Sequence, residues 1–120
     1  MNYVINYIAK KIGAKSYLEI GKGSEESFNQ IKVDYKVGVD TNSQRPNTRR
    51  HISDEFFEYN KEKFDLILIN GLHHVDQVYK DIINALSVLN PGGYIICHDM
   101  LPTSEDMQIT PFASDRDWET

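Results

Sequence analysis

The sequence has 120 residues, of which 32 are Leu, Ile, Val or Phe, so it is long and apolar enough to fold as one domain. Its net charge is −5 and it has no basic run longer than Arg49-Arg50, which excludes the charge pattern of a nucleic-acid-binding protein. The sequence has no long apolar stretch and no secretory signal, so we expect a soluble cytoplasmic domain that contacts no membrane. Cys97 is its single cysteine, so we expect no internal disulfide.

The first half of the chain alternates helical and strand patterns. An apolar stripe with helical spacing predicts a helix over residues 3–11, which packs Tyr3 and Tyr7 against a sheet and ends at Gly13. The next elements are expected in this order: a strand at Ser16–Ile20, a helix capped by Ser24 or Ser27 and reaching Ile31, a strand at Tyr35–Val39, a polar loop, and a short strand at His51–Ile52.

The second half continues the alternation. Ser53 is a helix cap followed by acids, and Phe56 and Phe57 on this helix are expected to pack on the sheet. Apolar residues at helical spacing predict a helix from Val75 to Leu89, ended by Asn90-Pro91-Gly92-Gly93. Nearly continuous apolar runs predict strands buried on both faces at Phe64–Ile69 and Tyr94–Cys97, with Cys97 in the core.

This alternation predicts an α/β fold, a Rossmann-like doubly wound parallel sheet in three α/β/α layers. We expect a domain over residues 1–102. Residues 103–120 have no sustained periodicity, and we interpret them as an arm, a substrate lid or a disordered tail.

Unusual polar residues gather where the expected strands end. Ligands of an open parallel sheet bind beyond the carboxyl ends of its strands. Gly21-x-Gly23 follows the first strand, and Asp40 comes 19 residues after Gly21, a separation that suits an acid holding a ribose diol. Plain turn chemistry explains each of these features equally well alone, but together they favour an adenosine-type ligand. The later strands end in Asn70-Gly71-Leu72-His73-His74 and His98-Asp99.

Four ordered motifs then resemble a known family. They are Tyr17-Leu-Glu-Ile-Gly21, Val37-Gly-Val-Asp40, Phe64-Asp-Leu-Ile-Leu-Ile-Asn-Gly-Leu-His73 and Leu89-Asn-Pro-Gly-Gly-Tyr-Ile-Ile-Cys-His-Asp99. The chain resembles a class I S-adenosylmethionine-dependent methyltransferase, in the group associated with glycan and antibiotic-sugar biosynthesis. The resemblance implies S-adenosylmethionine as cofactor and a small hydroxylated acceptor such as a sugar. The cofactor-binding residues that it implies are Glu19, Gly21, Gly23, Asp40, Ser53, Asp54 and Asn70.

The sequence departs from this family at three places. The usual third glycine of the loop falls on Glu25, Asn70 stands where relatives have aspartate, and the usual strands six and seven are missing. In metal-dependent relatives the ligand positions match Asn70, His98 and Asp99. Of these, only Asp99 is a good ligand for Mg²⁺, so a divalent metal at His98 and Asp99 is a secondary expectation.

His73 is the candidate catalytic base, because an imidazole that titrates near neutrality can take the proton from an attacking hydroxyl. The alternative is that His73 caps the helix that follows it. Two other functions compete with the enzyme: a reduced, non-catalytic cofactor-binding or assembly domain, and a nicotinamide-binding domain, disfavoured because its last fingerprint glycine falls on Glu26. The missing strands predict an open sheet edge, covered in a homodimer or higher oligomer.

Overall fold

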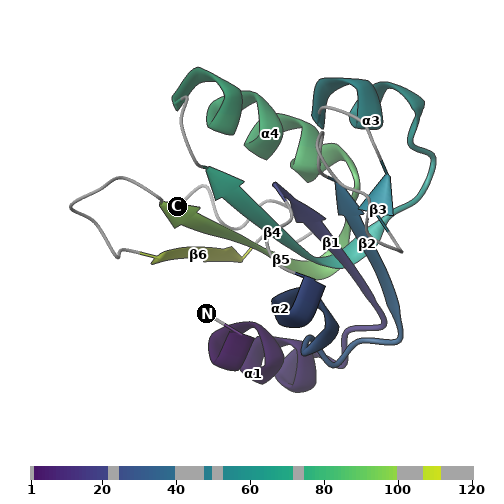
Figure 1. The fold of residues 1–120 in the computed structure, drawn as a ribbon, viewed down its shortest axis with the longest axis vertical. Helices are drawn as coiled ribbons and strands as arrows, with labels where there is room; N and C mark the ends of the chain where they lie inside the picture. Colours follow the sequence, from purple (N-terminus) through teal and green to yellow (C-terminus); the bar gives the residue numbers. More distant parts are fainter. Residues whose placement is uncertain are drawn as a thin grey trace.

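The computed structural model describes residues 2–21, 25–39, 48–49, 53–71, 75–99 and 107–111. These residues form one sheet with helices on both faces (Figure 1). The helices are α1 (Asn2–Ile12), α2 (Glu25–Asn29), α3 (Ser53–Tyr59) and α4 (Val75–Ser87). The strands are β1 (Ser16–Ile20), β2 (Tyr35–Val39), β3 (Thr48–Arg49), β4 (Phe64–Gly71), β5 (Leu89–Asp99) and β6 (Met107–Pro111).

The sheet has the strand order β3-β2-β1-β4-β5-β6. Strands β1 to β5 run parallel to their neighbours, and β6 runs antiparallel to β5. The order runs outward in one direction from β1 to β3 and in the other from β4 to β6, so it reverses between β1 and β4. The predicted doubly wound, Rossmann-like α/β fold is confirmed.

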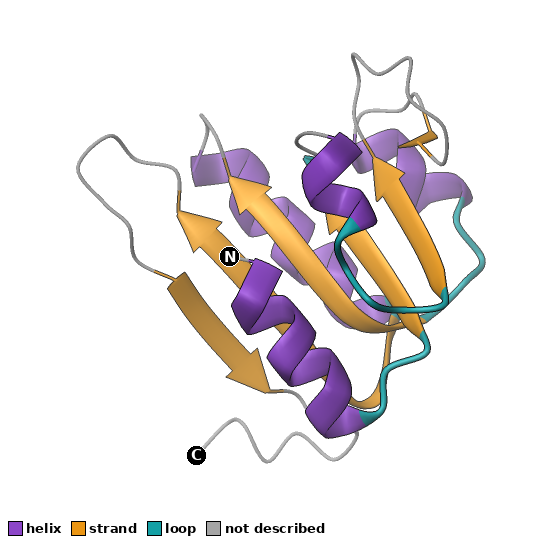
Figure 2. Cartoon of the chain, turned by 60° about the horizontal axis from the view of Figure 1, so that its bottom comes forward, coloured by secondary structure: helices purple, strands orange, loops and turns teal. Residues whose placement is uncertain are grey.

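Two hydrophobic cores lie on opposite faces of the sheet, because successive side chains of a strand point to opposite sides. In β1, Tyr17 packs in the core beneath α1 and α2, whereas Leu18 and Ile20 pack in the core beneath α3 and α4. Figure 1 shows these two helix pairs on either side of the sheet, and Figure 2 shows α1 lying across the nearer face. The central strands β1 and β4 therefore contribute to both cores.

The helix α1 buries a different stripe from the one predicted. Ile5, Ile8 and Ala9 enter the core, while Tyr3 and Tyr7 are 83% and 59% exposed. The expectation that these tyrosines pack on the sheet is wrong, because aromatic and aliphatic residues share the helical spacing and the sequence does not indicate which stripe turns inward. The same expectation for Phe56 is confirmed, since this side chain is buried in α3.

The edge beside β5 is not open. Strand β6 pairs with it from Tyr94↔Pro111 to His98↔Met107, so the expectation of an open edge beside β5 is wrong, whereas the predicted oligomer stays a prediction. The sequence analysis placed no strand in residues 103–120, because Met107–Pro111 is short, ends in proline and carries no clear alternation. The sheet thus gains a sixth strand from the segment that we had interpreted as an arm, lid or tail.

Several boundaries also differ from the prediction: the helix expected to reach Ile31 ends at Asn29, and the strand expected at Tyr94–Cys97 runs from Leu89 to Asp99. The helix α4 ends at Ser87, and Leu89 belongs to β5, because Phe64 donates its N–H to the carbonyl of Val88 and pairs with Leu89, which draws the chain into the sheet. The short third strand lies at Thr48–Arg49, whereas the predicted position, His51–Ile52, is outside the described residues. Among the described helices, none is both long and apolar enough to cross a membrane.

Candidate functional site

The candidate site lies at the carboxyl ends of β1 and β4, where the strand order reverses. Ligands of open α/β sheets bind at this kind of switch point, since the connections there leave to opposite faces and open a crevice. Gly21 directly follows β1, and Asn70 is the next-to-last residue of β4. The register pairs Ile20 with Ile69, so Gly21 and Asn70 extend two neighbouring strands side by side.

Gly21 requires the absence of a side chain. Its φ is +79°, and a Cβ added there would lie 2.8 Å from the carbonyl oxygen and 3.1 Å from the Cβ of Asn70. Its N–H donates to the carbonyl of Val39, 2.9 Å away, which ties the turn to β2. The backbone after β1 is therefore held between two strands, and the missing Cβ lets it lie against the main chain of Asn70.

Asn70 has one satisfied and one unsatisfied polar atom. Its Nδ2 donates to the carbonyl of Gly21 at 3.2 Å. Its Oδ1 is buried and has no hydrogen-bond partner in the described part of the chain. Because the Gly21 carbonyl can only accept, it orients the amide with the oxygen free. A buried acceptor without a donor is costly, so the geometry favours a ligand that donates a hydrogen bond at this point.

Glu19 is held inside the sheet. The residue is only 6% exposed, and its Oε1 accepts a hydrogen bond of 2.6 Å from the hydroxyl of Tyr17 on the same strand face. Burial, followed by the charge of Glu19 and this hydrogen bond, raises the pKa of Tyr17 well above its ordinary value. Tyr17 therefore stays protonated and always donates a hydrogen bond to Glu19. Glu19 lies two residues before Gly21.

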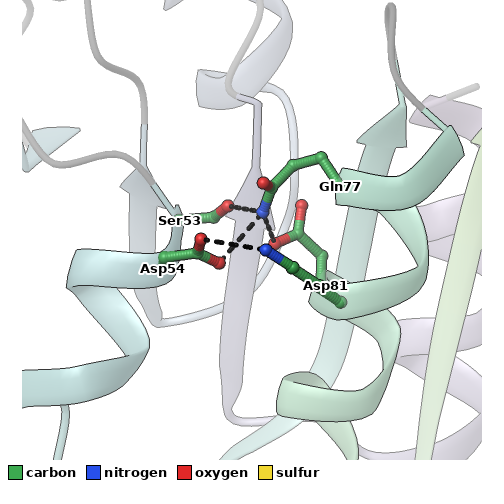
Figure 3. Close-up of polar contacts among 5 residues, drawn as sticks. Ser53, Asp54, Gln77 and Asp81 are labelled. Atoms are coloured by element: carbon green, nitrogen blue, oxygen red, sulfur yellow. Dashed lines mark hydrogen bonds and ion pairs between the residues drawn. The ribbon is translucent and has the colours of Figure 1, made fainter.

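Ser53 and Asp54 begin α3 and are bound to α4 (Figure 3). The Nε2 of Gln77 donates to Ser53 Oγ at 2.9 Å, to Asp54 Oδ1 at 3.1 Å and to Asp81 Oδ1 at 3.0 Å. Asp81 is 5% exposed, and its burial raises the pKa of its carboxyl. The cluster fixes the start of α3 against α4.

Gln77 and Asp81 are not among the site residues predicted from the sequence. The available signal was the position of Asp81 within the apolar stripe of α4, between Val78 and Ile82, with Gln77 four residues before it on the same helical face. A charged residue in such a stripe indicates a partner on the packed element, which here is the start of α3.

The end of β5 lies beside the end of β4. His98 pairs with Asn70, and Asp99 pairs with Gly71, so the sequence expectation that these residues share one place on the sheet is confirmed for their backbones. The donor set is one amide oxygen, one imidazole and one carboxylate, which fits a hard cation such as Mg²⁺ poorly. Among the described residues no group of three His, Cys, Asp or Glu side chains is arranged to hold a metal.

Cys97, one residue earlier in β5, is partly buried against the α3–α4 core, as predicted, and burial raises the pKa of its thiol. Three predicted site residues, Gly23, Asp40 and His73, lie outside the described residues.

A doubly wound sheet with a glycine turn at its switch point defines a class of α/β domains that bind nucleotide-like cofactors. The chain belongs to the methyltransferase-domain family, which matches it over residues 14–100. The resemblance to class I S-adenosylmethionine-dependent methyltransferases is therefore confirmed for the domain. No curated protein sequence matches the chain significantly.

Solved structures share the fold at low sequence identity. The O-methyltransferase from Bacillus cereus, in complex with S-adenosylhomocysteine, has a TM-score of 0.66 and 18% identity, over 88% of this chain and 61% of that one. A Klebsiella pneumoniae protein inferred to be an O-methyltransferase has a TM-score of 0.68 and 20% identity, over 88% and 60%. The N-methyltransferase NodS from Bradyrhizobium japonicum WM9 has a TM-score of 0.60 and 16% identity, over 80% and 62%. This chain thus spans less than two thirds of each.

Proposed function

We propose that the domain binds S-adenosylmethionine at the carboxyl ends of β1 and β4 and transfers its methyl group to a hydroxyl of a small acceptor such as a sugar. Membership of the methyltransferase-domain family supports the cofactor class. The observation that carries the proposal is the buried, unpartnered Oδ1 of Asn70 beside the Gly21 turn, at the place where the strand order reverses.

The residues present fit this cofactor. The methionine part of S-adenosylmethionine carries an ammonium group, which can only donate hydrogen bonds. Such a group would supply the donor that the Oδ1 of Asn70 does not find among the described residues. Gly21 holds the turn after β1 against Asn70, which supports a single binding place formed by both residues. We assign Gly23 and Glu19 to the same end of the cofactor, Asp40 to the ribose hydroxyls, and the start of α3 at Ser53 and Asp54 to the adenine.

The reaction then needs alignment and a place for one proton. The cofactor supplies a methyl group on a sulfonium, which leaves as a neutral thioether when the acceptor oxygen forms its bond to the methyl carbon. The acceptor hydroxyl loses its proton in this step, and we assign His73 as the group that takes it. No step in this proposal uses a metal ion.

Calorimetric titration with S-adenosylmethionine and S-adenosylhomocysteine, with NAD as the control ligand, tests cofactor binding. We expect micromolar binding of the first two ligands and none of NAD. Asn70→Leu removes both the free acceptor and the bond to Gly21, and should weaken binding by about 10- to 100-fold, since a charged hydrogen bond is worth roughly 1.5–3 kcal/mol. Asn29→Leu, the same change at an exposed position of α2, is the matched control and should bind normally.

Asp40→Ala should also weaken cofactor binding, if the carboxylate holds the ribose. Failure of the unaltered chain to bind either cofactor, or normal binding by Asn70→Leu, would contradict the proposal. Once binding is established, release of S-adenosylhomocysteine with sugar and phenol acceptors tests the reaction. His73→Ala should then lose turnover and keep its cofactor affinity, whereas equal turnover in the variant refutes the role of His73.

A second function has its own support. Asn70, near the end of β4, stands where the family resemblance implies an aspartate, and its neutral amide favours a domain without catalytic activity. A non-catalytic domain that binds the cofactor or serves in an assembly would show cofactor binding without turnover of any acceptor.

A further inference from the structure

The outer side of α1 carries a groove of about 560 Å³ that we call the basic groove, lined in part by Tyr3, Tyr7, Lys10, Lys15 and Lys32. No acidic side chain is among its lining residues. Within the described part of the chain, none of the three lysines forms an ion pair. The groove is thus a locally cationic, aromatic surface on a chain whose net charge is −5.

The opposite side of the sheet carries a second groove, of about 600 Å³, between α3 and α4, which we call the acidic groove. Asp54 and Glu58 line it on α3. The single basic residue of its lining, Lys80, has its Nζ 4.0 Å from the carboxylate of Asp54, so Glu58 is the unmatched charge. Its wall on α4 includes the exposed apolar residue Ile83.

One wall of each groove is a ridge of exposed apolar side chains on a helix. Tyr79 and Ile83 are one helical turn apart on α4 and are 66% and 49% exposed. Tyr3 and Tyr7 are one turn apart on α1 and are also exposed. Helices pack by placing the ridges of one in the grooves of another, so each surface offers a ridge to the other's groove.

From this complementarity we propose that the chain associates with a second copy of itself, with the basic groove of one copy against the acidic groove of the next. Lys10 and Lys32 then face Glu58 of the neighbour, and Tyr3 and Tyr7 lie along the acidic groove of that neighbour. Figure 1 shows α1 and the α3–α4 pair on opposite sides of the sheet, so the contact is head-to-tail, and it generates rings or open chains of copies.

Charge contributes to this contact chiefly through long-range attraction and through the choice of partner. Salt screens such attraction over a Debye length of roughly 10 Å at 0.1 M ionic strength. Self-association should therefore weaken as the salt concentration rises, while the apolar ridges maintain a residual contact. An isologous dimer that uses only one of the two grooves would place like charges opposite each other.

Sedimentation velocity of the full chain tests the proposal. We expect the mean mass to rise with protein concentration in dilute buffer, and to fall back toward the monomer when salt shortens the Debye length to about 3 Å, near 1 M. The variant Lys10→Glu/Lys32→Glu reverses the basic groove and should weaken association by about tenfold or more. The matched control Lys61→Glu/Lys63→Glu makes the same change in net charge at exposed positions outside both grooves, and should still associate.

Mixing two variants with opposite charge reversals tests whether the two grooves contact each other. The variant Glu58→Lys/Asn84→Lys reverses the acidic groove, and alone it should associate about tenfold more weakly than the unaltered chain, as Lys10→Glu/Lys32→Glu should. Each native groove in the mixture meets a complementary native groove of the other variant, and the two reversed grooves also complement each other, so mixing should restore association into alternating copies of the two variants. A monomeric unaltered chain at every concentration, association unaffected by the reversals, or a mixture that stays monomeric would overturn the proposal.

Discussion

The glycine turn after β1 allows a quantitative test of how the candidate site is built. Gly21→Ala forces an alanine to adopt φ +79°, which costs an L-residue about 1–2 kcal/mol. It also places a Cβ 2.8 Å from the carbonyl oxygen of Asn70, which belongs to the backbone of a central strand and cannot move alone. Such overpacking adds about 1–3 kcal/mol, so we expect a total loss of roughly 2–5 kcal/mol.

Two other glycines separate these contributions. Gly13 has a φ of +66° and nothing within 4 Å of an added Cβ, so Gly13→Ala carries the backbone cost alone, about 1 kcal/mol. Gly93 has no positive φ, but an added Cβ would lie 2.6 Å from the carbonyl oxygen of Asp65, so Gly93→Ala carries the contact cost alone. The loss at Gly21 should exceed the loss at Gly13 by an amount similar to the loss at Gly93.

The assay is urea unfolding of the three variants beside the unaltered chain, with the free energy of unfolding extrapolated to water. The slope with urea should stay constant, because the surface exposed on unfolding does not change. The reasoning is refuted if Gly21→Ala loses no more stability than Gly13→Ala, since the contact with Asn70 would then contribute nothing.

Two further predictions concern buried carboxylates. Asp81→Asn should be more stable than the unaltered chain near pH 7. Burial raises the pKa of Asp81 above 3.8, so the protonated carboxyl stabilises the folded chain, and this stability is lost as the pH rises through the raised pKa. An asparagine stays neutral at every pH and does not have this loss. The advantage should shrink as pH falls toward about 4, and a difference independent of pH in urea unfolding would contradict this. Tyr17→Phe deletes the donor to buried Glu19 and should cost about 1.5–3 kcal/mol by the same assay; an unchanged midpoint would show that this hydrogen bond adds no stability.

Much of the sheet could be predicted from the sequence. Ser16–Ile20 and Tyr35–Val39 are strands with the predicted bounds, because their apolar runs lie between clear turn signals. The polar residues after β1, β4 and β5 were expected at one edge of the sheet, since parallel strands end on the same side, and the register confirms this for Asn70 and His98.

The remaining features depend on tertiary contacts that leave no local pattern. Tyr3 and Tyr7 were placed in the core, but Ile5 and Ile8 fill it instead, because the space beneath α1 selects the stripe. The strand β6 follows from pairing with β5 rather than from its own alternation. The free Oδ1 of Asn70 depends on which atom faces Gly21, which only the three-dimensional arrangement determines.

The separation of the two cores by the sheet has a consequence for how sequences of this fold diverge. A substitution beneath α1 meets neighbours such as Tyr17, and one beneath α4 meets neighbours such as Leu18, so each layer can be repacked without a compensating change in the other. The turn at Gly21, in contrast, is held by a main-chain hydrogen bond to Val39 of β2 and by the side chain of Asn70 in β4, and neither contact belongs to either core. The side chains on both faces can therefore be replaced almost entirely while the strand ends keep their arrangement, which accounts for a shared fold at 16% to 20% identity.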